Sequence, residues 1–276
     1  MITNGLKRPM SISKIKARLL YDDHIKSTVL LLGIYAFTCG INLPYASLVG
    51  MNTCEFVLYM ITDHYYLIYA WLFYLFFITA KQTKCKSVIE RIRYSTSLEY
   101  YYYCIAAAMI RLASIIVAHI FVSMAVGCTR LHISYIFEVS AASTIAGTSL
   151  EVLNDYAGQF NNPFLAIGAV VVWWMAGSTF FSAILLLSYE LWNNKGLIAC
   201  TCTILVSVMI GFITEIDEGP MGFLLFNNYY ILHHALANKC MMAVLVVEAG
   251  LCMTLCSLGR GRLKSSVFRG VRSMNG

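Results

Sequence analysis

The chain has 276 residues, of which 59% are hydrophobic and only 12% are charged, and its formal net charge is +6. A protein that folds in water normally carries about twice that charged fraction, so a water-soluble enzyme is not expected. The mean hydropathy is +0.69, and the apolar residues come in long blocks separated by short polar stretches. We expect an all-α polytopic membrane protein, because lipid requires every backbone polar group to be paired within the protein.

The segment 11–21 is expected to form an amphipathic helix at the inner membrane surface. Aliphatic residues recur there at helical spacing among basic side chains. The segment is either a dedicated interfacial helix or an ordinary basic stretch next to a span. No apolar core of a cleavable signal precedes it, so the first span is expected to anchor the chain.

Six apolar blocks are expected to cross the membrane as helices. The shortest has 19 residues, which at a rise of about 1.5 Å per residue is close to the thickness of the hydrocarbon layer. The blocks cover residues 28–50, 56–80, 99–126, 163–191, 196–214 and 240–258, and together they form one transmembrane domain over residues 1–276.

The positions of Lys and Arg orient these spans. Seventeen of the 20 basic residues precede the first span, follow the sixth, or lie between spans two and three or four and five. The opposite side has Arg130 and Lys239 against eight carboxylates, which include Glu55 and Asp63. Both termini are therefore expected to be cytoplasmic in a cell membrane. The positive net charge reflects this topology, and no nucleic-acid partner is expected.

The loop between the second and third spans is expected to contain a short cytoplasmic helix. Val88, Ile89 and Ile92 form an apolar stripe beside basic residues, and Thr96 with Glu99 forms a capping box that starts the third span afresh. Composition alone allows this helix either to pack on membrane lipid or to dock into a soluble partner.

Two stretches resemble the membrane subunits of type-2 ABC exporters, particularly the small permeases of Gram-positive bacteria for peptide or lantibiotic export and immunity. IERIRYSTSLEYYYY (89–103) is similar to that family's pattern before its third span. LLLSYELWNNKGLIACTCTIL (185–205) resembles the end of its fourth span, an Asn-Lys turn and the start of its fifth. The family pattern has basic residues where this chain has Leu98 and Glu99.

The segment 215–239 is similar to the re-entrant hairpin that such permeases place before their last span. It is apolar at its centre, MGFLLFNNYYIL, but is interrupted by Gly219, Pro220, Gly222, Asn227 and Asn228. Irregular backbone at membrane depth has to be sheltered by protein.

The resemblance implies a permease subunit powered by another chain. The sequence has no GxxxxGK[ST] phosphate loop, so ATP and Mg²⁺ are expected on a separate ATPase subunit and no cofactor on this chain. The unit should contain two ATPases and two permeases, the second a copy of this chain or a related one. The residues expected to dock into the ATPase are Cys85, Val88, Ile89, Arg91, Ile92 and Arg93. An amphipathic peptide is the substrate that the resemblance implies.

Two ionisable residues fall deep inside predicted spans, Arg111 in the third and Glu248 in the sixth. Each would cost about 2.5–3.5 kcal/mol if buried alone near the bilayer centre. Both are about ten positions, or roughly 15 Å, from the inner face. We expect an ion pair between them, which serves either as a buried strut or in substrate contact and gating.

Aromatic residues in the spans suggest a translocation path. His119, Trp173 and Trp174 are candidates to line it, although His119 alternatively forms a hydrogen bond to a neighbouring helix. His233 and His234 follow the hairpin segment and are expected to be ordinary outer-surface residues. They would make a poor chelating pair, because adjacent side chains on a helix diverge.

Other functions are weighed against the permease. An intramembrane hydrolase is not expected, because the sequence offers no paired carboxylates, nucleophile with its base, or HExxH motif, and its cysteines lack metal-ligand spacing. An ion or small-solute channel would also suit six helices with a re-entrant segment, but the broken segment occurs only once. A non-transporting scaffold or immunity protein also remains open.

Overall fold

The computed structural model describes residues 25–84, 97–139, 150–213, 225–237, 239–248 and 250. All regular structure in this part of the chain is helical, and five helices are long and apolar enough to cross a membrane. These candidate spans are Ile25–Leu48, Thr53–Lys81, Tyr101–Gly127, Pro163–Tyr189 and Leu191–Ile210. They coincide with the first five predicted blocks to within a few residues, which confirms the all-helical prediction.

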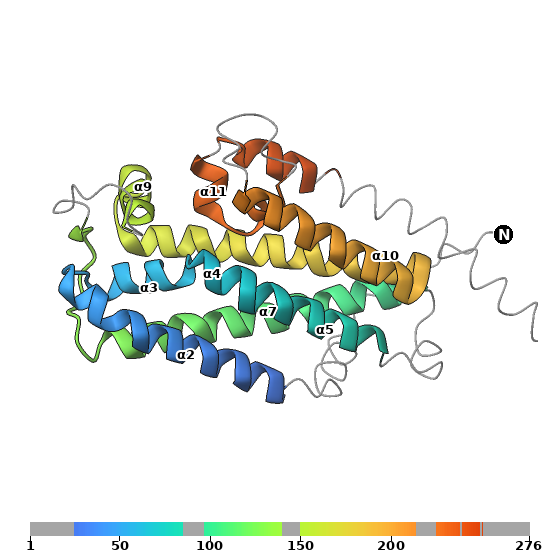
Figure 1. Ribbon diagram of the computed structural model, residues 1–276, viewed down its shortest axis with the longest axis horizontal. Coiled ribbons are helices and arrows are strands. Elements are labelled where there is room, and N and C mark those ends of the chain that lie inside the picture. The colour runs from blue at the N-terminus through green and yellow to red at the C-terminus, as the bar shows by residue number, and fades with distance from the viewer. Residues whose placement is uncertain are drawn as a thin grey trace, which may run out of the picture.

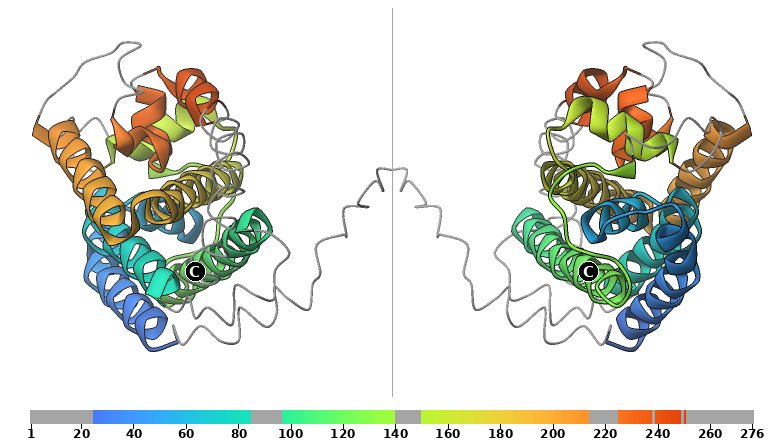
Figure 2. Two further views of the ribbon diagram at one scale, coloured as in Figure 1. Left: turned by 90° about the vertical axis from the view of Figure 1, so that its right-hand side faces the viewer. Right: turned by 90° about the vertical axis from the view of Figure 1, so that its left-hand side faces the viewer.

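The long helices run side by side along the longest axis of the molecule (Figure 1), with α7 in contact with α2, α3 and α10. Seen end-on, α9 and α11 gather on the side of α10 that faces away from α2 (Figure 2). The elements are α2 (Ile25–Leu48), α3 (Thr53–Ile61), α4 (His64–Tyr66), the π-helix η1 (Leu67–Leu72), α5 (Phe73–Lys84), α7 (Ser97–Gly127), α9 (Glu151–Gln159), α10 (Pro163–Ile213), the 3₁₀-helix η3 (Phe226–Tyr229) and α11 (Leu232–Ala237).

Several predicted features fall outside the described residues. These are the amphipathic segment 11–21, the ATPase-docking helix from Cys85 to Arg93, and part of the segment 215–239. A helix begins after Cys240, where the sixth span is predicted, and residues 251–258 of that span lie beyond the described part.

Helix α10 consists of two antiparallel arms joined by a tight turn at Asn193 (φ 54°, ψ −145°). Asn tolerates positive φ better than other non-glycine residues. The turn also requires Gly196, since a Cβ atom there would lie 2.3 Å from the carbonyl oxygen of Ser188 and 2.8 Å from Cβ of Trp192. The Asn-Lys turn expected between the fourth and fifth blocks is thus where the chain reverses.

The second candidate span is interrupted near its middle. Helix α3 ends at Ile61, and after Thr62 the side chain of Asp63 caps α4, its Oδ1 accepting from the backbone N–H groups of Tyr65 (3.0 Å) and Tyr66 (3.3 Å). The wide π-helical turn of η1 follows directly. Such turns are rare and concentrate at functional sites.

A buried capping box organises the end of the bundle at which α3 begins, called the α3 end below. Asn52 and Glu55 cap one another's backbone amides, each at 3.0 Å. The second carboxylate oxygen of Glu55 accepts from the backbone amides of Glu138 (2.6 Å) and Val139 (3.0 Å), and Asn52 Nδ2 of the side chain donates to the carbonyl of Ile136 (2.9 Å). The connection after α7 is thereby fixed to α3. Glu55 is fully buried, although its sequence position suggested a loop carboxylate.

The capping box yields a stability prediction. Glu55→Gln keeps one acceptor oxygen but places an NH₂ group against an N–H donor, so we expect a loss on the order of 1–3 kcal/mol. Glu138→Gln is the matched control, because Glu138 forms a more exposed pair with His132, and such pairs contribute about 1 kcal/mol at most. Thermal unfolding of both variants in detergent measures the difference. Equal melting temperatures would contradict the role given to Glu55.

The short helix η3 is wedged between the two arms of α10. The backbone N–H of Phe226 donates to Ser207 Oγ on the second arm (3.3 Å), while Trp173 Nε1 on the first arm donates to the Asn228 carbonyl (3.1 Å). Protein hydrogen bonds from both sides therefore shelter this irregular backbone.

The depth of this wedge follows from the helix register. Gly177 precedes Asn193 by 16 residues and Ser207 follows it by 14, which corresponds to about 24 Å and about 21 Å at 1.5 Å per residue. A Cβ atom on Gly177 would lie 2.0 Å from the carbonyl oxygen of Tyr229. The backbone of η3 therefore contacts α10 directly, well inside the bundle.

This close approach is testable with two matched glycine substitutions. Gly177→Ala forces η3 away from α10 and should lower the unfolding temperature by several degrees. Gly168→Ala lies on the same arm with open space around it, and it should be neutral or gain up to about 1 kcal/mol from helix propensity. Thermal unfolding of the pair gives the comparison, and a Gly177→Ala protein as stable as Gly168→Ala would mean that η3 does not pack as described.

Candidate functional site

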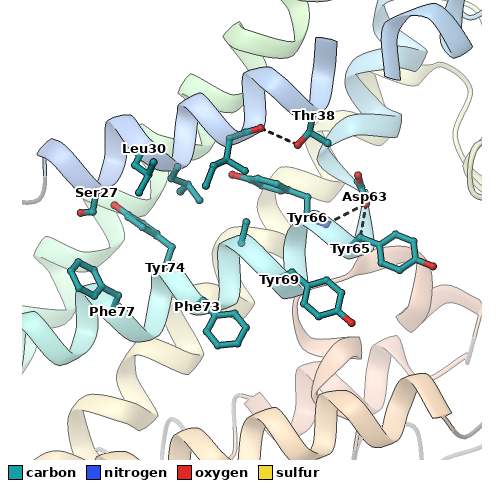
Figure 3. A pocket seen from close by; sticks show the side chains of 13 residues that line it. Ser27, Leu30, Thr38, Asp63, Tyr65, Tyr66, Tyr69, Phe73, Tyr74 and Phe77 are labelled. Carbon is teal, nitrogen blue, oxygen red and sulfur yellow. Dashed lines mark hydrogen bonds between the residues drawn. The ribbon is translucent and has the colours of Figure 1, made fainter. Parts of the chain in front are cut away.

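A groove of about 640 Å³ lies between α2 and the run α4–η1–α5 (Figure 3). One wall is a row of aromatic rings spaced four residues apart: Tyr65, Tyr69, Phe73 and Phe77. Each ring is more than half exposed, and the rings of Tyr65 and Tyr69 stack with centroids 6.5 Å apart. This row forms a long aromatic surface that the described helices leave exposed.

Helix α2 forms the opposite wall. Its lining residues Ser27, Leu30, Ile34 and Thr38 follow helical spacing along one face. At the Ser27 end the hydroxyl groups of Thr28 and Tyr74 form a hydrogen bond of 2.8 Å, which connects α2 to α5. Apart from Asp63, every residue that lines the groove is uncharged.

Asp63 lies at the other end of the groove, beside Tyr65 and Tyr66 (Figure 3). Counting charges beside the spans assigns it to the outer side, whereas the structure places it ten residues into the second candidate span. The break after α3 holds it there. A carboxylate at such depth is costly and marks a functional site by default.

Behind the groove, Tyr66 connects α4 to α7. Its hydroxyl and His119 Nε2 are 2.5 Å apart, and His119 Nδ1 lies 2.7 Å from the carbonyl of Ile115. A carbonyl can only accept, so Nδ1 carries a proton, and a neutral ring then accepts from Tyr66 at Nε2. The neutral form suits this fully buried site, because a buried cation would require a charged partner.

The His119 ring is the centre of an aromatic cluster. Its centroid lies 4.4 Å from that of Tyr35, 5.5 Å from Trp174 and 5.7 Å from Trp71. Trp71 Nε1 donates to Ser178 Oγ at 2.9 Å. The cluster therefore joins α2, η1, α7 and α10 and fills the middle of the bundle.

The structure brings together two of the three residues expected to line a translocation path. His119 and Trp174 are in contact, whereas Trp173 points its indole N–H toward η3. All three are buried and none lines the groove described above. The structure shows a hydrogen bond between His119 and Tyr66 of a neighbouring helix. That these residues line a translocation path stays a prediction.

Arg111 lies on α7, and Glu248 lies on the helix that begins after Cys240. Glu248 Oε1 is shielded from solvent and has no hydrogen-bond partner among the described residues. The ion pair expected between the two stays a prediction.

Contrary to expectation, His233 is not an outer-surface residue. It is buried, because α11 packs on α9 and near α4. The His233 ring lies 4.5 Å from His234 and 6.5 Å from Tyr156, and His234 lies 6.2 Å from His64. Burial, followed by the charge of His64, lowers the pKa of His234 to about 4, and burial also lowers the pKa of His233 well below its usual value.

These pKa shifts predict acid sensitivity. Between about pH 6.5 and pH 4 the unfolded chain binds a proton at each site and the folded protein does not, so the free energy of unfolding falls as the pH falls. The loss at His234 is on the order of 3 kcal/mol. A variant with His233→Gln and His234→Gln should lose much of this decline in thermal unfolding measured at pH 7, 5.5 and 4.

His132→Gln is the control for that experiment, because His132 is exposed and pairs with Glu138. Its acid decline should match that of the wild type. If the double variant declines as steeply as the wild type, the histidine cluster is not the cause.

Sequence reasoning missed the groove although two signals of it are present. Asp63 is a charge inside the apolar block 56–80, as Arg111 is inside its own block. The four-residue spacing of Tyr65, Tyr69, Phe73 and Phe77 was also readable. Neither signal shows that α2 leaves these rings uncovered, which depends on the tertiary packing.

Comparison with known proteins identifies no relative. No family model, curated protein or solved structure matches the chain. The function is therefore argued from the residues and geometry described above.

Proposed function

We propose that this chain is the membrane subunit of an ATP-driven exporter for an amphipathic substrate, with a separate ATPase subunit that binds ATP and Mg²⁺. The observation that carries the proposal is the aromatic groove between α2 and α4–η1–α5, which has a single carboxylate inside a candidate span. Such a groove, open along its side, suits a molecule that enters from the lipid phase.

The wedge at η3 supports the same proposal. In the proposed topology the segment 215–239 is a re-entrant hairpin, the helix after Cys240 begins a sixth span, and both termini are cytoplasmic. The contacts of η3 with both arms of α10 provide the shelter that such a hairpin needs. A peptide remains the preferred substrate on the resemblance stated for residues 89–103 and 185–205.

An axial channel is the second candidate, and the packing of the described residues disfavours it. Trp71, Trp174 and His119 are almost fully buried in the middle of the bundle, whereas the groove opens at the side. A monomeric pore through this bundle would have to displace the aromatic cluster. A channel should conduct in planar bilayers without nucleotide, which an exporter subunit should not do.

Coupling to the ATPase is tested at the predicted docking helix. With a co-expressed ATPase in liposomes, charge reversal of Arg91 and Arg93 to Glu should lower permease-stimulated ATP turnover at least about tenfold, the effect of losing roughly one charged contact. Arg130→Glu, on the predicted opposite side, is the matched control and should retain turnover. ATP hydrolysis and substrate efflux are measured together.

Two results would overturn the proposal that the chain is an exporter subunit. One is that the purified chain stimulates no co-expressed ATPase, and the other is that the Arg91 and Arg93 variant transports as well as the wild type. A scaffold or immunity protein would give the first result together with an intact membrane complex.

A further inference from the structure

The lining of the groove changes in character along its length, and its negative charge lies at one end. Asp63 Oδ1 accepts two backbone amides as the cap of α4, and no Lys or Arg among the described residues forms an ion pair with Asp63. A carboxylate inside a span requires a partner or water. A cation delivered by a ligand would neutralise this charge.

The aromatic rings next to Asp63 suit the same cation. Tyr65 lies next to Asp63 and Tyr69 follows it along the groove (Figure 3). The two rings stack, and the faces of such rings attract ammonium and guanidinium groups. Phe73 and Phe77 continue the row as a purely apolar surface. The groove therefore offers a cation site at one end and a hydrophobic surface along the rest.

The length of the groove limits its occupant. Ser27 and Thr38 line its two ends and are 11 residues apart on α2, which is about 16 Å along a helix. An extended peptide of about five residues has this length.

We propose that the groove binds a hydrophobic peptide segment whose ammonium or guanidinium group pairs with Asp63. This inference rests on the proposed exporter, whose substrate class it names. A zwitterionic phospholipid fits less well, because its phosphate would lie beside the carboxylate. Asp63 is also about 15 Å from the start of α3, which is below headgroup level in the proposed topology.

The test compares two peptides that differ by one charge. A fluorescent N-acetylated peptide of four leucines and a C-terminal lysine amide is titrated into the full chain in phosphatidylcholine nanodiscs, with empty nanodiscs as background. The second peptide carries an acetyl group on the lysine side chain, which removes the charge. The wild type should bind the charged peptide at least about tenfold more tightly, as expected for one charged contact.

Three variants assign the effect to the groove. Asp63→Asn retains a side chain that caps helices and should bind both peptides equally. Asp155→Asn, on α9 and away from the groove, should keep the wild-type preference. Phe73→Ala should weaken binding of both peptides by a similar factor, because it removes apolar surface and no charge.

Several outcomes would overturn the proposal. The proposal fails if the wild type binds the two peptides with equal affinity, whether or not Asp63→Asn folds. It also fails if Asp63→Asn still prefers the charged peptide. Loss of peptide binding when phosphatidylethanolamine replaces phosphatidylcholine would assign the site to a lipid amine. If the wild type self-associates and neither peptide dissociates the complex, the groove binds a second copy of this chain.

Because this assay contains no ATPase, it separates the two proposals. Charge-selective binding through Asp63 without ATPase coupling would refute the exporter and retain the site. Coupling without charge-selective binding would refute the site and retain the exporter.

Discussion

The geometry of the groove depends on the exchange of backbone for side-chain hydrogen bonds at the break in the second span. Thr62 Oγ1 donates to the carbonyl of Tyr59 at 3.2 Å, and Asp63 Oδ1 accepts from the amides of Tyr65 and Tyr66. Because hydrocarbon offers no replacement partners, the chain can change direction at membrane depth only where side chains take over. Beyond the break, Tyr66 turns inward to His119 while Tyr65 faces the groove.

Several buried polar groups of the bundle are paired by other segments of the chain. The indole of Trp71 reaches Ser178, that of Trp173 reaches the η3 backbone, and Glu55 gathers three amides at the α3 end. Except for the contact between Glu55 and the Asn52 amide, each contact joins segments far apart in sequence. The partly exposed Asp63 differs from this pattern because its surroundings include the open groove.

Composition predicts the five candidate spans well, because block length and hydropathy are set by the hydrocarbon itself. Side-chain partners are harder to predict, since they depend on how each helix is rotated about its axis. Equal depth suggested a pair between Arg111 and Glu248 but carried no information on which faces meet. His233 seemed exposed for the same reason, as its burial depends on α9 and α4. The Asn52–Glu55 capping box, in contrast, has a sequence signature that was available.

The π-helix η1 determines which direction the second half of the aromatic row faces. A turn of this kind holds one residue more than an α-turn. In a regular α-helix one extra residue would rotate all that follows by about 100°, and the wide turn absorbs it. Without this turn Tyr65 and Phe77 would therefore lie on different faces of the helix, with every side chain unchanged. The extra residue of η1 therefore aligns the two halves of the aromatic wall of the groove.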